Sequence, residues 1–272
     1  MVFPALKSRY GYICAASALA LILNPKVQAI EVDTELVVLV DTAADSSDFD
    51  LIIESVARSF EQQSFIDSVA AGANGSIAAS LILFNVSNNE SVSVSIPWME
   101  LSSAADLQNF ANTVRGVQRL NVGNVSYANA IAEGAAEIAS SVFEGTTSQL
   151  TVIDDGSGFF EAQPAATRAA RDSALASSVD VINAIVFDVA FQVNTVENYY
   201  NDNVVGGLNG SVVAIDSPQG GPKPLEDLDA IEDAISFQIT DSTVTNVSAV
   251  PEPSSSLLLI ASSLGLLARR KR

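Results

Sequence analysis

The chain has 272 residues, of which 48% are apolar, and a formal net charge of −19 with no histidine and one cysteine. This composition is typical of a globular protein with one domain of ordinary to large size. Without histidine, neither a Ser-His-Asp triad nor a Cys-His pair can form, and a catalytic zinc ion would lack its usual imidazole ligands.

The first 29 residues have the organisation of a secretory signal peptide. Two basic residues precede an apolar stretch at about 11–23, and a small-x-small site ends at Ala29. The apolar stretch is shorter than the ~20 residues of a membrane span. We therefore predict a signal peptide over residues 1–29, cleaved after Ala29. Cys14 leaves with it, so the mature protein has no disulfide and depends on core packing for its stability.

Apolar runs and helical patterns then alternate along the chain. Continuous apolar runs at 35–40 and 76–85 are typical of strands buried on both faces, and strict alternation at 91–97 predicts an edge strand beside the second. Further strands are expected at 149–153, 179–187 and 211–215, and helices at 47–63, 103–115, 126–143, 163–177, 193–202 and 225–239. The glycines of residues 205–207 are assigned to a turn. The pattern predicts an α/β fold with a doubly wound, mostly parallel six-stranded sheet and helices on both faces.

The C-terminal 22 residues combine three features in a fixed order. A Pro-Glu-Pro triplet at 251–253 precedes an apolar stretch at 257–268 and a basic end at 269–272. This arrangement resembles the PEP-CTERM sorting signal of Gram-negative bacteria that export exopolysaccharide. The resemblance implies that the apolar segment anchors the chain transiently in the inner membrane, until an exosortase cuts near the triplet and releases or re-anchors the product. The alternative is a simple tail anchor, for which 12 apolar residues are few.

The body between the two terminal signals is strongly acidic. Removing residues 1–29 and 251–272 takes away seven of the 13 Lys and Arg but one of the 32 Asp and Glu, which leaves six against 31, a net charge of −25. Such a surface repels nucleic acid and anionic lipid. It is compatible with divalent cations, and equally with charge that serves solubility alone.

Asp41 ends the first predicted strand, at the edge of the sheet where doubly wound folds bind ligands. A strand that ends in Asp before a loop of small residues resembles a von Willebrand factor type A domain. Three further stretches resemble a bacterial secreted subfamily of unassigned function: IPWMEL (96–101), GNVSYANAIAEGA (123–135) and ENYYNDNVVGG (197–207). The resemblance covers about residues 33–240 and implies one antiparallel edge strand and, commonly, a metal-ion-dependent adhesion site.

The resemblance implies a site whose oxygen ligands come from three loops. Oxygen ligands suit the hard cations Mg²⁺ and Ca²⁺. The first loop has the pattern Asp-x-Ser-x-Ser. Asp41 matches its first position, but Ala43 offers no oxygen in place of the first serine, and Asp45 replaces the second serine with a charged group.

The other two loops supply a threonine before the middle helix and an aspartate after the fourth strand. Val125 aligns with the threonine, although Ser126 is adjacent and can serve after a shift of one residue. The aspartate is Asp154 or Asp155, and the glycine that follows favours Asp155.

Two interpretations of this altered pattern remain open. A rearranged site would use Asp41, Asp45, Ser126, Asp155 and water, with more negative charge than usual and a preference for Ca²⁺. Alternatively the site is lost and the acids are solvated loop residues. The number of altered positions favours a degenerate site.

We therefore predict a secreted, surface-sorted von Willebrand A-like binding or adhesion module over residues 30–240, with a polar linker at 241–250 and the sorting segment at 251–272. It would be no enzyme, and its partner would be an extracellular polysaccharide or a surface protein. The main alternative is a structural matrix protein without a specific partner. A carbohydrate-active enzyme with a carboxylate pair is the third possibility.

Overall fold

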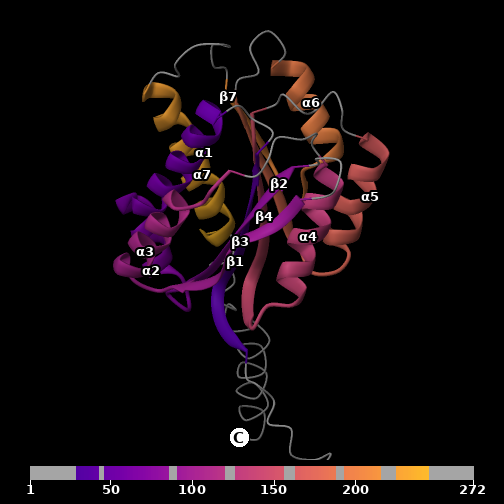
Figure 1. The fold of residues 1–272 in the computed structure, drawn as a ribbon. Coiled ribbons are helices and arrows are strands. Elements are labelled where there is room, and N and C mark those ends of the chain that lie inside the picture. The colour runs from indigo at the N-terminus through magenta and orange to yellow at the C-terminus, as the bar shows by residue number, and fades with distance from the viewer. Residues whose placement is uncertain are drawn as a thin grey trace, which may run out of the picture. The chain divides into compact units, whose positions relative to one another are not determined.

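The computed structural model describes residues 29–42, 46–85, 91–119, 126–155, 163–187, 193–215 and 225–244. The described residues from Glu31 onward belong to one compact unit. The elements, labelled in Figure 1, are β1 (Ile30–Asp41), α1 (Ser46–Glu61), α2 (Gln63–Ala71), β2 (Ile77–Asn85), β3 (Ser91–Leu101), α3 (Ala104–Arg115), α4 (Tyr127–Ala139), β4 (Phe143–Asp154), α5 (Pro164–Leu175), β5 (Val181–Phe187), α6 (Val193–Asn203), β6 (Gly206–Gly207), β7 (Val212–Ile215) and α7 (Leu225–Val244). None of the helices among these described residues is both long and apolar enough to cross a membrane. The predicted signal peptide up to residue 28 and the sorting segment lie outside the described residues.

The strands form one mixed sheet in the order β3-β2-β1-β4-β5-β6, with β7 also paired to β5. The pairs β1–β2, β4–β5 and β5–β7 are parallel, whereas β3 runs antiparallel to β2 at the edge. The predicted doubly wound sheet with an antiparallel edge strand beside the second strand is confirmed. The strand order reverses between β1 and β4, because the chain builds β2 and β3 on one side of β1 and the later strands on the other.

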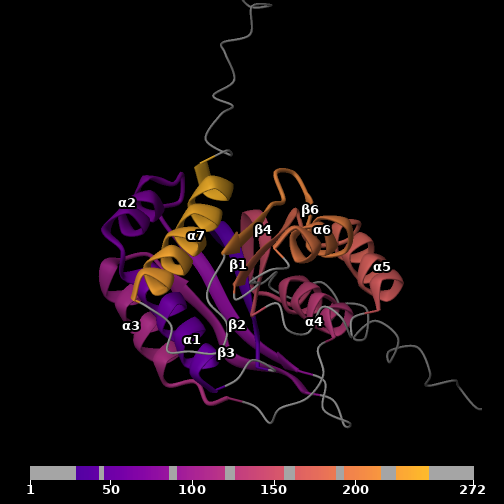
Figure 2. The ribbon, with the colours of Figure 1, turned by 90° about the horizontal axis from the view of Figure 1, so that it is seen from above.

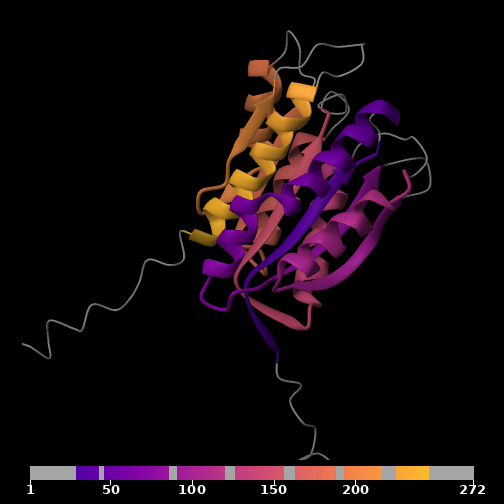
Figure 3. The same cartoon turned by 90° about the vertical axis from the view of Figure 1, so that its left-hand side faces the viewer.

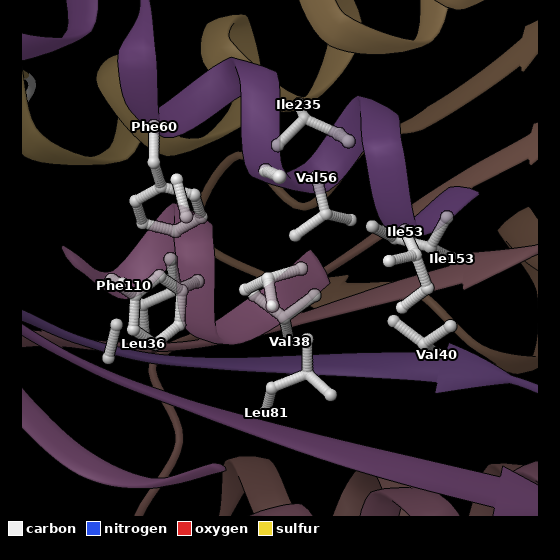
Figure 4. Packing of buried hydrophobic residues seen from close by; sticks show 14 of the residues in the cluster. Leu36, Val38, Val40, Ile53, Val56, Phe60, Leu81, Phe110, Ile153 and Ile235 are labelled. Atoms are coloured by element: carbon white, nitrogen blue, oxygen red, sulfur yellow. The ribbon is translucent and has the colours of Figure 1, made fainter. Parts of the chain in front are cut away.

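Helices cover both faces of the sheet. Figure 2 shows α1, α2, α3 and α7 on one side and α4, α5 and α6 on the other. Alternate side chains of β1 enter different cores: Leu36, Val38 and Val40 pack beneath α1 and α3 (Figure 4), whereas Val37 and Leu39 pack against α4. Burial on both faces explains why β1 and β2 are continuous apolar runs in the sequence.

The predicted helix at 47–63 corresponds to α1, which ends at Glu61, and a second helix that was not predicted, α2, begins after Gln62. The backbone of Gln62 is extended, with φ −63° and ψ 133°. Phe60 and Phe65 flank the break, and both are buried in the same core with ring centroids 5.1 Å apart. Residues five apart do not share a face of an uninterrupted helix, so the break lets both rings reach the core.

The assignment of residues 205–207 entirely to a turn is wrong, because Gly206 and Gly207 form β6 and raise the strand count from six to seven. Gly207 pairs with Val181 of β5. Gly207 has φ +87°, and a Cβ atom there would lie 2.0 Å from the carbonyl oxygen of Asp180. Only glycine fits this close approach, so a residue pair without strand propensity still joins the sheet.

Every arginine in the described part of the chain contacts a residue that is distant in sequence. Arg58 of α1 forms ion pairs with Asp229 and Glu232 of α7, which runs beside α1 in Figure 3. Arg115 of α3 binds Glu54 and Glu61 of α1. The remaining contacts are from Arg119 to the carbonyl of Thr42, from Arg168 to Asn203, and from Arg171 to the carbonyl of Asp202. The arginines of the described residues thus bridge segments that are distant in sequence.

Candidate metal centre at the carboxyl ends of β1 and β4

Two aspartates end neighbouring strands at the point where the strand order reverses. Asp41 is the last residue of β1, and Asp154 is the last residue of β4. In doubly wound sheets this position opens a crevice for ligands. Both side chains are fully buried, with 0% exposure.

Asp155 completes a cluster of three carboxylates. Asp41, Asp154 and Asp155 each offer one carboxylate oxygen, and these three oxygens lie within 4.8 Å of one another. Asp155 is 6% exposed, so the alternative interpretation of these acids as solvated loop residues is wrong for Asp41 and Asp155. We call the group Asp41, Asp154 and Asp155 the β1–β4 lip.

Two tyrosines from the helices on one face converge on Asp154. The hydroxyl groups of Tyr127 on α4 and Tyr200 on α6 both donate hydrogen bonds to Oδ2 of Asp154. The two hydroxyl oxygens are 2.8 Å apart, and the rings meet edge to face with centroids at 5.5 Å. Asp154 lies on this face because it has the same parity along β4 as Leu150 and Val152, which pack in the same core.

The protonation state of the tyrosine pair follows from its surroundings. Burial, reinforced by the nearby carboxylate of Asp154, raises the pKa of Tyr127 and of Tyr200 well above the usual value. Both phenols therefore remain neutral donors. A carboxylate has two oxygens with about four lone-pair positions, so the tyrosines engage one oxygen of Asp154 and leave the group able to accept further.

The residues next to Asp41 are also fixed. The backbone N–H of Thr42 donates to the carbonyl of Phe84 on β2 at 3.0 Å. Nε of Arg119 donates to the carbonyl of Thr42, the residue after Asp41, at 3.1 Å.

The remaining positions of the family pattern are placed as follows. Ser126 is the N-cap of α4, where its Oγ accepts a hydrogen bond from the N–H of Asn129 at 3.3 Å. A hydroxyl oxygen has two lone pairs, so this cap does not exhaust its acceptor capacity. Ala43, Asp45 and Val125 lie outside the described residues.

The donor set of the lip fits a hard divalent cation. All its ligand atoms are carboxylate oxygens, which Mg²⁺ and Ca²⁺ prefer. Three buried like charges at this separation repel one another, and a cation or bound protons would relieve that repulsion. Asp154 was left as an alternative to Asp155 by the sequence, yet both belong to the cluster. The tyrosine pair was not predicted, although Tyr127 and Tyr200 lie in two of the stretches that carry the family resemblance.

Comparisons with known proteins agree with this fold. A family model described as "Protein of unknown function (DUF1194)" matches residues 31–221, and one described as "PEP-CTERM protein-sorting motif" matches residues 249–272. The second match confirms the sorting signal recognised at the C-terminus. No curated protein matches the chain in sequence.

Solved structures with similar folds include the pilus adhesin SpaC from Lactobacillus rhamnosus GG, at TM-score 0.54 and 12% identity over 78% of this chain and 31% of that one. Another is the proximal thread matrix protein 1 from the mussel byssus with a zinc-occupied MIDAS motif, at TM-score 0.50 and 12% identity over 76% and 48%. A manganese-loaded TRAP protein of Plasmodium vivax matches at TM-score 0.48 and 12% identity over 78% and 73%. The chain spans about a third of the length of SpaC and about half that of the byssus protein. The α/β fold is von Willebrand A-like.

Proposed function

Because the chain belongs to the family described as "Protein of unknown function (DUF1194)", has a von Willebrand A-like fold and carries a PEP-CTERM motif, we propose that it is a secreted, non-enzymatic binding module of the extracellular polysaccharide matrix. The motif indicates export and surface sorting in Gram-negative bacteria, with processing by an exosortase. In this proposal the partner binds at the β1–β4 lip and is an extracellular polysaccharide or a surface protein.

The observation that carries the proposal is the burial of three carboxylates at the carboxyl ends of the neighbouring strands β1 and β4. Moving an isolated carboxylate out of water is strongly unfavourable unless it is paired, hydrogen-bonded or bound to a metal. Asp154 has two phenol donors, and the lip as a whole has the composition of a cation site. Asp41, Asp154 and Asp155 would hold Ca²⁺ or Mg²⁺, with Asp45 and Ser126 as further ligands.

The site departs from the family pattern at Ala43, Asp45 and Val125, so it is a degenerate version of the adhesion site. The additional carboxylate at Asp45 increases the negative charge, and the loss of the first serine removes a neutral ligand. A ligand set of several carboxylates with water favours Ca²⁺, which accepts six to eight oxygens in flexible geometry, over the strict octahedron of Mg²⁺.

A bound cation would also change what the acidic body can bind. At a net charge of −25 the body repels anionic polymers over the distance of the Debye length, about 8 Å at physiological ionic strength. A divalent cation at the lip offsets two of the three carboxylate charges and places a positive centre among them. Its coordination positions that the protein does not fill then accept oxygens from a polysaccharide or from an acidic side chain of a surface protein.

Capture experiments test this function. The processed protein, recovered from the producing cells and immobilised, is exposed to exopolysaccharide and to surface proteins of those cells, in millimolar Ca²⁺ and in EDTA. We expect saturable capture in Ca²⁺ that is lost in EDTA and in the variants Asp41→Asn and Asp155→Asn. Asp67→Asn, at an exposed position on α2, removes one charge elsewhere and is the matched control. Weak adsorption that depends on salt but not on Ca²⁺ would instead support the structural matrix protein.

A further inference from the structure

A polar cleft of about 390 Å³ opens between α1 and the segment that follows α3. Its lining residues are Phe49, Asp50, Ile53, Glu54, Arg115, Val117, Gln118 and Arg119. Phe49 and Ile53 are 3% and 6% exposed, so they form an apolar base beneath polar walls. The volume lies within the ~300–1,000 Å³ of small-molecule sites. We call this the α1–α3 cleft.

The walls of the cleft are held by contacts within the protein. The guanidinium group of Arg115 donates to both carboxylate oxygens of Glu54, at 2.9 and 3.1 Å, and to both of Glu61, at 2.6 and 2.8 Å. These hydrogen bonds raise the pKa of Arg115 and lower that of Glu61, so both groups stay charged. On the other wall, Arg119 is fixed to the carbonyl of Thr42. A cleft organised in this way loses little side-chain entropy when a ligand enters.

The lining of the α1–α3 cleft contains guanidinium groups as well as carboxylates, in a body that is otherwise strongly acidic. Its lining includes two carboxylates, Asp50 and Glu54, and two guanidinium groups, Arg115 and Arg119. Both oxygens of Glu54 are engaged by Arg115, so the lining has no carboxylate pair open to a cation, and the acidic body around it repels an anion. A wholly apolar ligand would displace the water that hydrogen-bonds to these charged groups and would offer them no hydrogen bonds in return, which is unfavourable.

A ligand that suits this lining carries hydroxyl groups that donate and accept, together with an apolar face, and has no charge. We infer that the α1–α3 cleft binds a neutral sugar residue, one unit of an extracellular polysaccharide. The sugar ring would lie over Phe49 and Ile53, with its hydroxyl groups toward Asp50, Gln118 and the guanidinium groups. This inference rests on the proposed matrix association, but it uses none of the lip carboxylates.

The cleft and the β1–β4 lip meet at Arg119, which lines the cleft and binds the carbonyl of Thr42, the residue after Asp41. Sugar binding in the cleft needs no cation, whereas binding at the lip does, so the two sites are separable by EDTA.

The test is a calorimetric titration of the processed protein in EDTA with oligosaccharides released from the producing cells' exopolysaccharide by partial hydrolysis, separated into a neutral and an acidic fraction. We expect the neutral fraction to bind and to saturate. Asp50 and Gln118 are both exposed, and the double variant Asp50→Ala/Gln118→Ala should bind it about tenfold or more weakly, the loss expected for one or two hydrogen bonds.

The matched control is Gln63→Ala/Asp67→Ala, which removes the same two residue types from the exposed face of α2. It should bind the neutral fraction as tightly as the wild type. The inference is overturned if the neutral fraction does not bind, if only the acidic fraction binds, or if the cleft variant matches the control. Loss of Ca²⁺-dependent capture of the intact polymer, with sugar binding in EDTA retained, would contradict the proposed function of the lip but not the cleft.

Discussion

The hydroxyl oxygen of Tyr200 on α6 lies 2.8 Å from that of Tyr127 on α4, and both groups donate to the same oxygen of Asp154. The three residues come from positions 127, 154 and 200, so this contact joins two helices of one face to the end of a central strand. All three side chains are buried. The pair keeps a buried carboxylate hydrogen-bonded at the point where the lip carboxylates meet.

Replacing either tyrosine by phenylalanine should lower the free energy of unfolding by about 1–3 kcal/mol, because a buried carboxylate loses a donor while the ring packing remains. Urea denaturation of Tyr127→Phe, Tyr200→Phe and the double variant measures this loss. Since both donate to one oxygen, the two effects should not be additive. Tyr199→Phe is the control, because its ring packs beside Tyr127 and Tyr200 while its hydroxyl group is paired with the uncharged Thr167, so its loss should change stability less. Equal losses in all three single variants would show that the carboxylate contact is not the cause.

Calcium should raise the melting temperature of the protein through the lip. A ligand at a hundredfold its Kd stabilises the native state by about 2.7 kcal/mol, which for a domain of this size corresponds to roughly 5–10 °C. The measurement compares melts in EDTA, millimolar Mg²⁺ and millimolar Ca²⁺ at fixed ionic strength.

General screening of an acidic body raises every curve, so Asp41→Ala and Asp155→Ala are the controls. A Ca²⁺ shift in the wild type that is absent from both variants supports a working site. Equal shifts in all three proteins, or none, would mean that the site is lost and that the partner uses another surface.

The ion pairs of Arg115 should make part of the stability dependent on pH. Arg115 binds Glu54 and Glu61, and their hydrogen bonds lower the pKa of Glu61. A carboxylate whose pKa is lowered on folding stabilises the native state above its unfolded pKa of about 4.3 and loses that contribution as the pH falls through the folded value. Arg115→Ala should therefore cost about 1 kcal/mol near pH 7, since the groups are partly exposed, and much less near pH 3.

Urea denaturation of the wild type and Arg115→Ala between pH 7 and pH 3 measures this difference. Arg168→Ala is the matched control, because Arg168 binds the uncharged side chain of Asn203 at 2.6 Å. Its effect on stability should stay constant over the same range. A difference for Arg115→Ala that does not shrink with falling pH would rule out the ion pairs as its source.

Processing at both ends should be visible by intact-mass spectrometry. Protein recovered from the envelope or the medium should begin near Ile30 and lack residues 257–272, because the first 29 residues resemble a signal peptide and residues 249–272 match the sorting motif. Deletion of the exosortase is the control and should leave the basic end in place. Retention of residues 257–272 in wild-type cells would favour a tail anchor.

The sequence predicts the fold well because its strongest signals are local. The apolar runs of β1 and β2 are long enough to require burial on both faces, and Asp41 ends the first of them. Helix α2 was missed because it follows a break at Gln62 that lets Phe60 and Phe65 share one core, and β6 was missed because glycine has a low strand propensity.

The site was predicted only in part because it depends on contacts between distant residues. Asp154 and Asp155 are neighbours, and alternate residues of a strand point to opposite faces, so the sequence alone does not show that both reach the cluster. The donors to Asp154 lie 27 and 46 residues away. The α1–α3 cleft joins residues 49–54 to residues 115–119, which no local pattern connects.

Because the described arginines act as bridges, the surface should tolerate the addition of positive charge better than its removal. Each described arginine both contacts a residue distant in sequence and carries one of the few positive charges, so its loss removes a bridge and leaves the body more negative. An added lysine at an exposed position away from these bridges removes no contact and reduces self-repulsion. The exterior can thus gain positive charge at many sites but can lose it at few. A protein engineer who wishes to change the surface charge should therefore add exposed lysines before replacing any of these arginines.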